Sequence, residues 1–446
     1  MSRSADRPSL AVEADPDEGE RAVPSRDADE RGYRSYEIYQ RRRITESSPD
    51  ILPRHLWSDR YLDDPYGLVG ALREHGPCYR DWAGNAFWVT RYDDVTSVLV
   101  DDANFETRTW RWSFDLHRRG RDLGRHVPVM QAEADVWDAD AADVAERLVA
   151  RALGAEGEVA LGVADRLAAE LECRVLGLDP DDWPWFVSTV GRLRNAGMAD
   201  PAGRASALSA FDELAARFDR LVDERRGDDG ADLISVAARL ELDRPVGGDD
   251  IAATVVEADP QTLPGSMANL WFLLATHPGH AERIVDDRRL VVAGWLEAVR
   301  HSPPVVAAER WARHEVERFG QLLPEGARVI CSVAAANRDP RIFGDPDTFD
   351  PFRLDLCQRE PRGHHRADGL AAGVVPALGP PSLFPAVPED RPRSRYARVR
   401  DVAVVATGAL LDRVGVPALA DPEAARPSAS RLGGPHRSWE LVVERT

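Results

Sequence analysis

Glu297 and Arg300 are the two residues whose types and spacing point most directly to a defined interaction. They stand three positions apart in the stretch EAVRHSPP. Residues with this spacing share one face of a helix, so the carboxylate and the guanidinium can meet. The chain is rich in arginine, and such a pair also occurs by chance. The pair therefore predicts a local ion pair on a helix, and its role depends on the segments that surround it.

Other chemistry-bearing residues are scattered rather than grouped. The four cysteines are Cys78, Cys173, Cys331 and Cys357, and no two of them have the C-x-x-C spacing of a redox or zinc site. We therefore expect buried, reduced thiols. The eleven histidines form no H-E-x-x-H motif, and we predict no metal site. The chain contains no lysine, so every one of its 57 basic residues is arginine. This excludes mechanisms that use a Schiff-base lysine or a phosphate-loop lysine.

The overall charge and hydropathy restrict the partners and the location of the protein. The formal net charge is −19 over 446 residues, and a negative surface repels phosphate backbones, so we expect no nucleic-acid partner. No apolar run approaches the roughly 20 residues that cross a bilayer. The first 32 residues lack an apolar signal-peptide core. These features predict a protein of the cytoplasm with no membrane partner.

Helical periodicity dominates the elements that must position these residues. Residues 1–32 are acidic and poor in large apolar side chains, so we predict a disordered tail. Two short strands are predicted around the turn AGN at residues 83–85, and a buried strand is predicted in RVICSV. The mainly apolar stretch of residues 250–278 predicts a central buried helix interrupted at Pro260 and Pro264. We interpret DDWPWF, residues 181–186, as a loop. With no linker after residue 40, residues 33–446 are predicted to form a single domain.

The segment that follows Arg300 resembles one family closely. It reads LLPEGARVICSVAAANRDPRIFGDPDTFDPFR and ends at Arg353. Together with the E-x-x-R pair, it resembles the cytochrome P450 superfamily over roughly residues 60–446. The resemblance implies a mainly α fold with small β-sheets. It also implies that Glu297, Arg300 and Arg353 form a buried triad that holds the fold, because the family's D-P-x-R arginine joins the E-x-x-R pair.

Three parts of the family's haem machinery are altered in this sequence. Aligned with the family's haem loop, Leu378 and Gly379 fall at its start, Leu383 at its basic position and Pro385 at its cysteine, the thiolate ligand of the iron. His126 lacks the arginine four residues later that would complete an H-x-x-x-R motif. On the central helix, Gln261 and Thr262 replace the family's acid–alcohol pair, and glutamine cannot relay a proton as a carboxylic acid does. Arg310 matches a family arginine that often meets a haem propionate.

These changes shape the functional expectation. The combination resembles the haem-free P450 homologues that bind and activate deoxysugar glycosyltransferases in macrolide and anthracycline biosynthesis. It implies a non-catalytic protein, a glycosyltransferase partner in polyketide antibiotic biosynthesis, no haem or other cofactor, and no catalytic, cofactor-binding or metal-binding residue. Two alternatives remain open. One is a haem-independent cyclase or isomerase that uses Thr262 in the old haem cavity, and the other is a haem monooxygenase with an atypical ligand.

Overall fold

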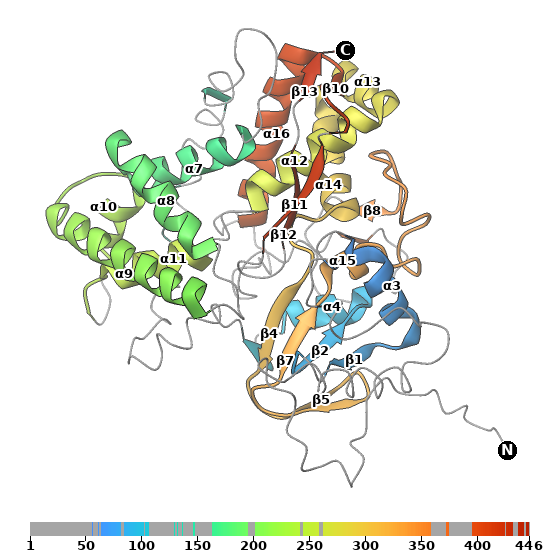
Figure 1. Cartoon of the computed structure of the whole chain (residues 1–446), viewed down its shortest axis with the longest axis horizontal. Helices are drawn as coiled ribbons and strands as arrows, with labels where there is room; N and C mark the ends of the chain where they lie inside the picture. Colours follow the sequence, from blue (N-terminus) through green and yellow to red (C-terminus); the bar gives the residue numbers. More distant parts are fainter. Residues whose placement is uncertain are drawn as a thin grey trace.

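The structure is a computed structural model, and it combines a sheet-containing part with a larger helical part (Figure 1). Apart from isolated positions such as Leu56, Tyr61 and Val129, it describes residues 64–81, 84–101, 103–106, 163–194, 201–240, 244–257, 262–357, 372–373, 395–423, 425–430, 436–440 and 443–445. The predicted tail of residues 1–32 lies outside these ranges, as does most of the segment between residues 107 and 162.

A five-stranded sheet forms the core of the sheet-containing part, in the order β1-β2-β7-β4-β3. The two strands predicted around AGN are confirmed as an antiparallel hairpin, and Asn85 adopts a positive φ of 47° in the turn between them. β2 then pairs in parallel with β7, and β7 pairs antiparallel with β4. The bounds are β1 Cys78–Asp81, β2 Ala86–Val89, β3 Phe105–Glu106, β4 Ala308–Ala312 and β7 Arg328–Cys331.

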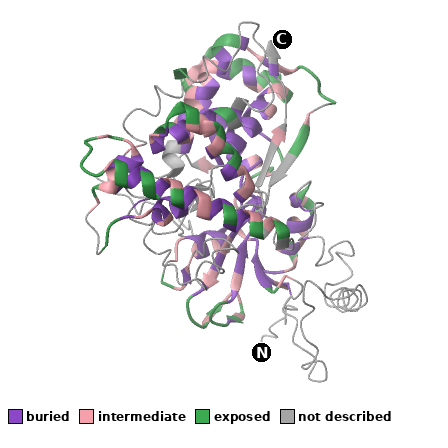
Figure 2. Cartoon of the chain, turned by 60° about the vertical axis from the view of Figure 1, so that its left-hand side comes forward, coloured by how far each residue is buried: buried purple, intermediate pink, exposed green. Residues whose placement is uncertain are grey.

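Three helices accompany this sheet: α3 (Pro65–His75), α4 (Tyr92–Leu99) and α15 (Val333–Ala336). α15 packs against both α3 and α4. The sheet therefore joins the N-terminal segment to residues more than 200 positions later, and their apolar side chains form shared buried clusters. Figure 2 shows that much of this sheet consists of buried residues.

The helical part is built around α12 (Thr262–Thr276), which packs against α7, α14 and α16. Twelve of its fifteen residues are buried, as expected for a helix that is apolar on every side. The predicted interruption is corrected in one respect, because Pro264 lies in the first turn of α12 rather than at a break. A proline is tolerated there, since the first N–H groups of a helix have no partner within the helix. α11 ends at Glu257, and residues 258–261, including Pro260, lie outside the described ranges.

The remaining helices follow the predicted periodicity, with one correction. The segment DDWPWF is not a loop, because a 3₁₀ turn, Pro180–Asp182, leads directly into α8, which begins at Trp183. Its Phe186 is buried in the main core. The bounds are α7 Val163–Leu176, α8 Trp183–Arg194, α9 Pro201–Glu224, α10 Leu233–Ala238, α11 Gly248–Glu257, α13 Pro278–Asp286, α14 Val291–His301 and α16 Arg395–Val414.

Four small two-stranded sheets complete the described architecture. Their strands are β5 Val316–Arg318 with β6 Gln321–Leu323, β8 Leu356–Cys357 with β9 Ala372–Gly373, β10 Pro417–Leu419 with β13 Val443–Arg445, and β11 Arg426–Ser430 with β12 His436–Glu440. The expected mainly α fold with small sheets is confirmed. Within the described ranges, no helix has the length and apolar character needed to span a membrane.

Candidate functional site

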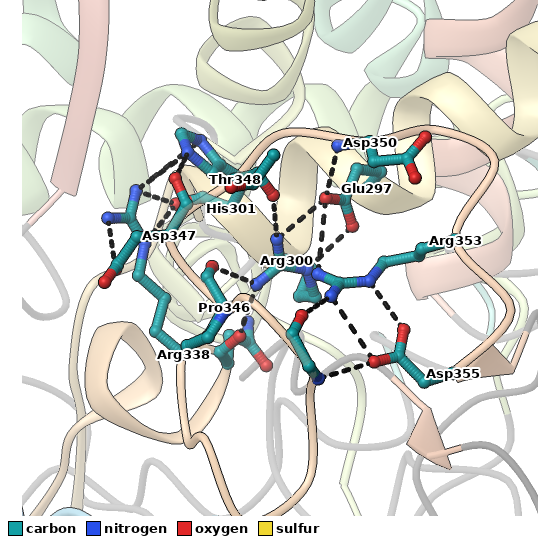
Figure 3. Close-up of polar contacts among 12 residues, drawn as sticks. Glu297, Arg300, His301, Arg338, Pro346, Asp347, Thr348, Asp350, Arg353 and Asp355 are labelled. Carbon is teal, nitrogen blue, oxygen red and sulfur yellow. Dashed lines mark hydrogen bonds and ion pairs between the residues drawn. The ribbon is translucent and has the colours of Figure 1, made fainter.

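The predicted pair of Glu297 and Arg300 is a buried, two-pronged ion pair in the second half of α14 (Figure 3). Arg300 Nε donates to Glu297 Oε2 at 2.7 Å, and Arg300 Nη2 donates to Glu297 Oε1 at 2.7 Å. Both side chains are 0% exposed. A bidentate contact of this kind is strong and fixes the orientation of both groups.

Arg300 also binds the coil that follows α15. Its Nη1 donates to the carbonyl oxygens of Asn337 and Pro346 at 2.9 and 2.7 Å, and its Nη2 donates to the carbonyl of Thr348 at 3.0 Å. With the two bonds to Glu297, these contacts occupy all five N–H donors of the guanidinium. Arg300 therefore ties α14 to backbone up to 48 residues away.

Arg353 joins this pair from the far end of the same coil, as the resemblance implied. Its Nη1 lies 3.5 Å from Glu297 Oε1. Its shorter contact is with Asp355, whose Oδ1 accepts from Arg353 Nε at 2.6 Å. Glu297 Oε1 also accepts from the backbone N–H of Asp350 at 3.0 Å. The sequence analysis did not identify Asp355 as a partner of Arg353. A carboxylate two residues after an arginine can indicate such an ion pair.

The triad holds the fold and has no access to a substrate. The carboxylate of Glu297 is fully buried, and the side chain of Arg353 is only 8% exposed. The contacts of Arg300 with the carbonyls of Asn337, Pro346 and Thr348, and those of Glu297 with Asp350 and Arg353, link α14 to the coil of residues 337–355. A buried charge set of this kind fixes the path of the chain, so its role is architectural.

The central helix α12 lacks ionisable side chains over its whole length, TLPGSMANLWFLLAT. Thr262 is buried at its first residue, where the resemblance placed the surviving alcohol. The buried hydroxyl of Ser266 donates to the carbonyl of Leu263 at 2.9 Å, and Asn269 Nδ2 donates to the carbonyl of Ser302 at 2.7 Å. These polar groups serve the packing of α12, and none of them is a general acid.

Arg310 is a buried cation on the central part of the sheet. It lies on β4, is 3% exposed and donates from Nη1 to the carbonyl of Glu309 at 2.8 Å. Burial raises the pKa of the neighbouring Cys331 thiol to about 12, although the positive charge of Arg310 opposes this shift. Cys331 is therefore protonated and inert at neutral pH.

The other cysteines and histidines in the described residues form no reactive group. Cys78 and Cys173 are free and buried, as predicted, and burial raises the pKa of both thiols. No cluster of metal-ligating side chains occurs in the part of the chain that the structure describes. Several residues of the sequence prediction lie outside the described ranges, namely His126, Gln261, Leu378, Gly379, Leu383 and Pro385.

Comparisons with known proteins give the chain its family context. The cytochrome P450 family profile matches residues 285–366, which include the triad. A solved structure, the cytochrome P450 PksS of the Bacillus subtilis bacillaene polyketide synthase, aligns with a TM-score of 0.67 at 18% identity, covering 89% of this chain and 100% of PksS. The chain has the cytochrome P450 fold.

Curated relatives strongly support membership of the cytochrome P450 superfamily. The cytochrome P450 monooxygenase PikC of Streptomyces venezuelae is 26% identical over 355 residues, which cover 72% of this chain and 82% of PikC. The erythromycin C-12 hydroxylase of Saccharopolyspora erythraea is 29% identical over 304 residues, which cover 64% of this chain and 76% of the hydroxylase. The relatives of this P450-fold chain thus include a protein named for a reaction of the antibiotic erythromycin.

These relatives overturn one expectation from the sequence. We expected no cofactor because Pro385 aligned with the cysteine of the haem loop, His126 lacked its arginine partner and Gln261 replaced the acid of the central helix. The similar proteins are cytochromes P450, which are haem proteins, so haem is the cofactor that the comparisons favour. The expectation failed because it rested on local changes at these three places, whereas the similarity extends over most of the chain.

The described residues include one group whose chemistry fits a haem. Arg310 carries a buried guanidinium, and guanidinium groups bind carboxylates such as haem propionates strongly. A bound haem would supply oxygen activation. Of the described residues, Arg310 would supply a cation for a propionate, Thr262 offers a buried hydroxyl, and the triad fixes the path of the chain.

Proposed function

We propose that this P450-fold protein binds a deoxysugar glycosyltransferase of polyketide antibiotic biosynthesis and stabilises the active form of that enzyme. In this role the P450 fold is a binding scaffold and performs no reaction of its own. The role is compatible with a bound haem, because it depends on the surface and rigidity of the scaffold rather than on the contents of its interior.

The observation that carries the proposal is the chemistry of α12. From Thr262 to Thr276 the helix has no acidic or basic side chain, and Gln261 precedes it in the sequence. Glutamine cannot donate and recover a proton as a carboxylic acid does. A scaffold that retains its structural triad but lacks this acid is better suited to binding than to oxygen chemistry.

The biosynthetic relatives supply the second support. The erythromycin C-12 hydroxylase is named for a reaction of a macrolide antibiotic. A stable complex buries on the order of 1,600 Å² of surface. A protein that binds only the active conformation of its partner raises the population of that conformation by mass action.

Co-expression tests this proposal. A deoxysugar glycosyltransferase of polyketide antibiotic biosynthesis from the same organism is produced alone, with the wild-type chain, and with a Thr262→Ala variant. We expect both forms of the chain to raise the yield of soluble, active transferase and to co-elute with it in size-exclusion chromatography. Addition of the purified chain to transferase that is already fully active should change its rate little.

The relatives also favour a second function, that of a haem monooxygenase, because PikC and the hydroxylase are named as oxygenases. The same experiment separates the two functions. If the chain neither co-elutes with the transferase nor changes its soluble activity, the partner role is wrong. If the haem-loaded chain with an electron donor then hydroxylates a macrolide, and Thr262→Ala abolishes this, the oxygenase role replaces it.

A further inference from the structure

His301 is the last residue of α14, directly after Arg300, and it contacts the coil that follows α15 (Figure 3). Its Nε2 lies 3.0 Å from the carbonyl oxygen of Asp347, and its Nδ1 lies 3.0 Å from Ser302 Oγ. A carbonyl can only accept, so Nε2 must carry the hydrogen. In the neutral ring, Nδ1 then accepts from the hydroxyl of Ser302, and the contact with Asp347 fixes the tautomer that carries its hydrogen on Nε2.

Cations face this imidazole from two sides. Arg338 Nη2 lies 3.3 Å from Nε2 and 3.5 Å from Nδ1 of His301. Arg338 cannot readily move away, because its Nε and Nη2 donate to the His301 carbonyl at 3.0 and 2.6 Å. Its guanidinium also stacks on the ring of Tyr66 from α3, 3.4 Å from the centroid. Arg300 adds a second positive charge from α14 itself.

The carboxylates nearby are already engaged. Asp347 Oδ1 accepts from Arg338 Nη1 at 3.1 Å, and Glu297 binds Arg300 and Arg353. A further ionisable group is His277, whose ring packs 5.2 Å from that of Phe349, while the ring of His301 lies 5.9 Å from the same Phe349 ring. A positive charge on His301 would therefore lie beside Arg338 and Arg300, whose carboxylate partners are already engaged with them.

We propose that neutral His301 is an acid-sensitive lock that holds the coil of residues 339–355 against α14. Binding of a proton to Nδ1 reverses the hydrogen bond with Ser302, whose hydroxyl can also accept, and places an imidazolium against the guanidinium of Arg338 and near that of Arg300. The imidazole then leaves its site, its bond to the Asp347 carbonyl is lost, and the coil that carries Arg353 opens.

The pKa of His301 sets the sign of this effect. Burial, followed by the charges of Arg338 and Arg300, lowers the pKa of His301 to about 3. In the open state the imidazole is in water, where its pKa is near 6.5. The open state therefore binds more protons between pH 6.5 and pH 3. The equilibrium constant for opening rises as the pH falls through this window, by up to about tenfold for each pH unit.

Hydrogen exchange of the full-length protein tests the lock. Exchange of amides in residues 339–355 is followed by mass spectrometry at pH 7.0, 6.0 and 5.0, after correction for the intrinsic pH dependence of exchange. In the wild type we expect the opening constant of this coil to rise about eightfold between pH 6.0 and pH 5.0 relative to that of α9. In His301→Gln this rise should be absent, because glutamine does not titrate, whereas the control His280→Gln should retain it.

Direct titration keeps the test decisive if His301→Gln does not fold. The imidazole signals of the wild-type protein are followed by NMR from pH 7.5 to pH 4.5, and His301 is assigned by its absence from any folded His301 variant or by residue-selective labelling. A signal that stays neutral until the coil opens supports the lock. A His301 pKa close to 6.5 in the closed protein, or an equal acid response in His301→Gln, would overturn it.

Discussion

At the scale of single residues, Glu297 shows how a buried charge can be retained without a chemical role. Its carboxylate accepts two bonds from Arg300 and one from the backbone of Asp350, and it lies within ion-pair distance of Arg353. Removal of one partner from such a set leaves the others charged and buried. A single substitution in this set therefore lowers the free energy of unfolding strongly, whereas replacing the whole set with apolar groups can leave that free energy almost unchanged.

Replacement of Glu297 by alanine should therefore destabilise the protein by about 3–5 kcal/mol, because Arg300 would remain buried without a counter-ion. Urea denaturation followed by circular dichroism measures this loss. Asp223 and Arg226 provide the matched control, since they have the same three-residue spacing but side chains that are 70% and 52% exposed. Asp223→Ala should change stability by less than about 0.5 kcal/mol. Equal effects of the two variants would contradict the architectural role of Glu297.

At the scale of elements, the start of α4 depends on a residue from a distant segment. The backbone N–H of Tyr92, the first residue of α4, donates to Asp339 Oδ2 at 3.1 Å across 247 residues. The residue at the N-cap position, Arg91, makes no side-chain cap. Asp339 is fully buried and also binds Arg341. A tertiary contact thus supplies the cap that the local sequence lacks.

Asp339→Ala should cost about 2 kcal/mol, at the upper end for a lost helix cap, because it also removes the tie between α4 and the coil. Hydrogen exchange of Tyr92–Leu99 should become faster in this variant. The control is Asp64→Ala, since Asp64 caps α3 through Tyr66 N at 3.1 Å at an exposed site. In Asp64→Ala, hydrogen exchange should become faster only in the first turn of α3. If exchange in α4 is unchanged in Asp339→Ala, then Asp339 does not act as its cap.

The charge of Asp339 gives this contact a pH dependence. Burial opposes ionisation of Asp339, but hydrogen bonds from Arg341 and from the backbone of Tyr92 outweigh it and hold the pKa of Asp339 below its usual range. A carboxyl group with a lowered pKa stabilises the folded state above its unfolded pKa, and this contribution is lost as the pH falls below about 4. Asp339→Asn should remove that part of the acid sensitivity.

The same elements show what could be predicted from the sequence. The strands around AGN, the buried helix α12 and the pairing of Glu297 with Arg300 follow from periodicity and spacing, so they were predicted correctly. The helical start of α8 at Trp183 was missed, because two tryptophans and a proline favour a loop locally, whereas burial of Phe186 in the core favours the helix. The cap from Asp339 and the lock at His301 join segments far apart in the chain, so no local pattern could indicate them.

At the scale of the whole molecule, the fold is held by contacts between segments that lie far apart in the sequence. The five-stranded sheet pairs β2 with β7, and α16 packs on α12 and α14. The triad fixes the coil between them. Such a frame stays rigid whatever its interior holds, so a binding function and a catalytic function can use the same scaffold.

Haem binding is the property of the whole molecule on which the sequence and the relatives disagreed. A substitution of Arg310 tests it, because the effect on haem retention can be measured. We expect the purified chain, after incubation with haemin, to show a Soret band and to retain haem through gel filtration. Arg310→Leu should weaken retention about tenfold, because a charge-assisted hydrogen bond contributes about 1.5–3 kcal/mol. The matched control is Arg313→Leu, because Arg313 follows the same strand, is exposed, and lies 3.3 Å from Glu106.

Equal retention of haem by the two variants would show that Arg310 does not hold a propionate. Absence of a Soret band in the wild type as well would show that the relatives' cofactor is not shared by this chain.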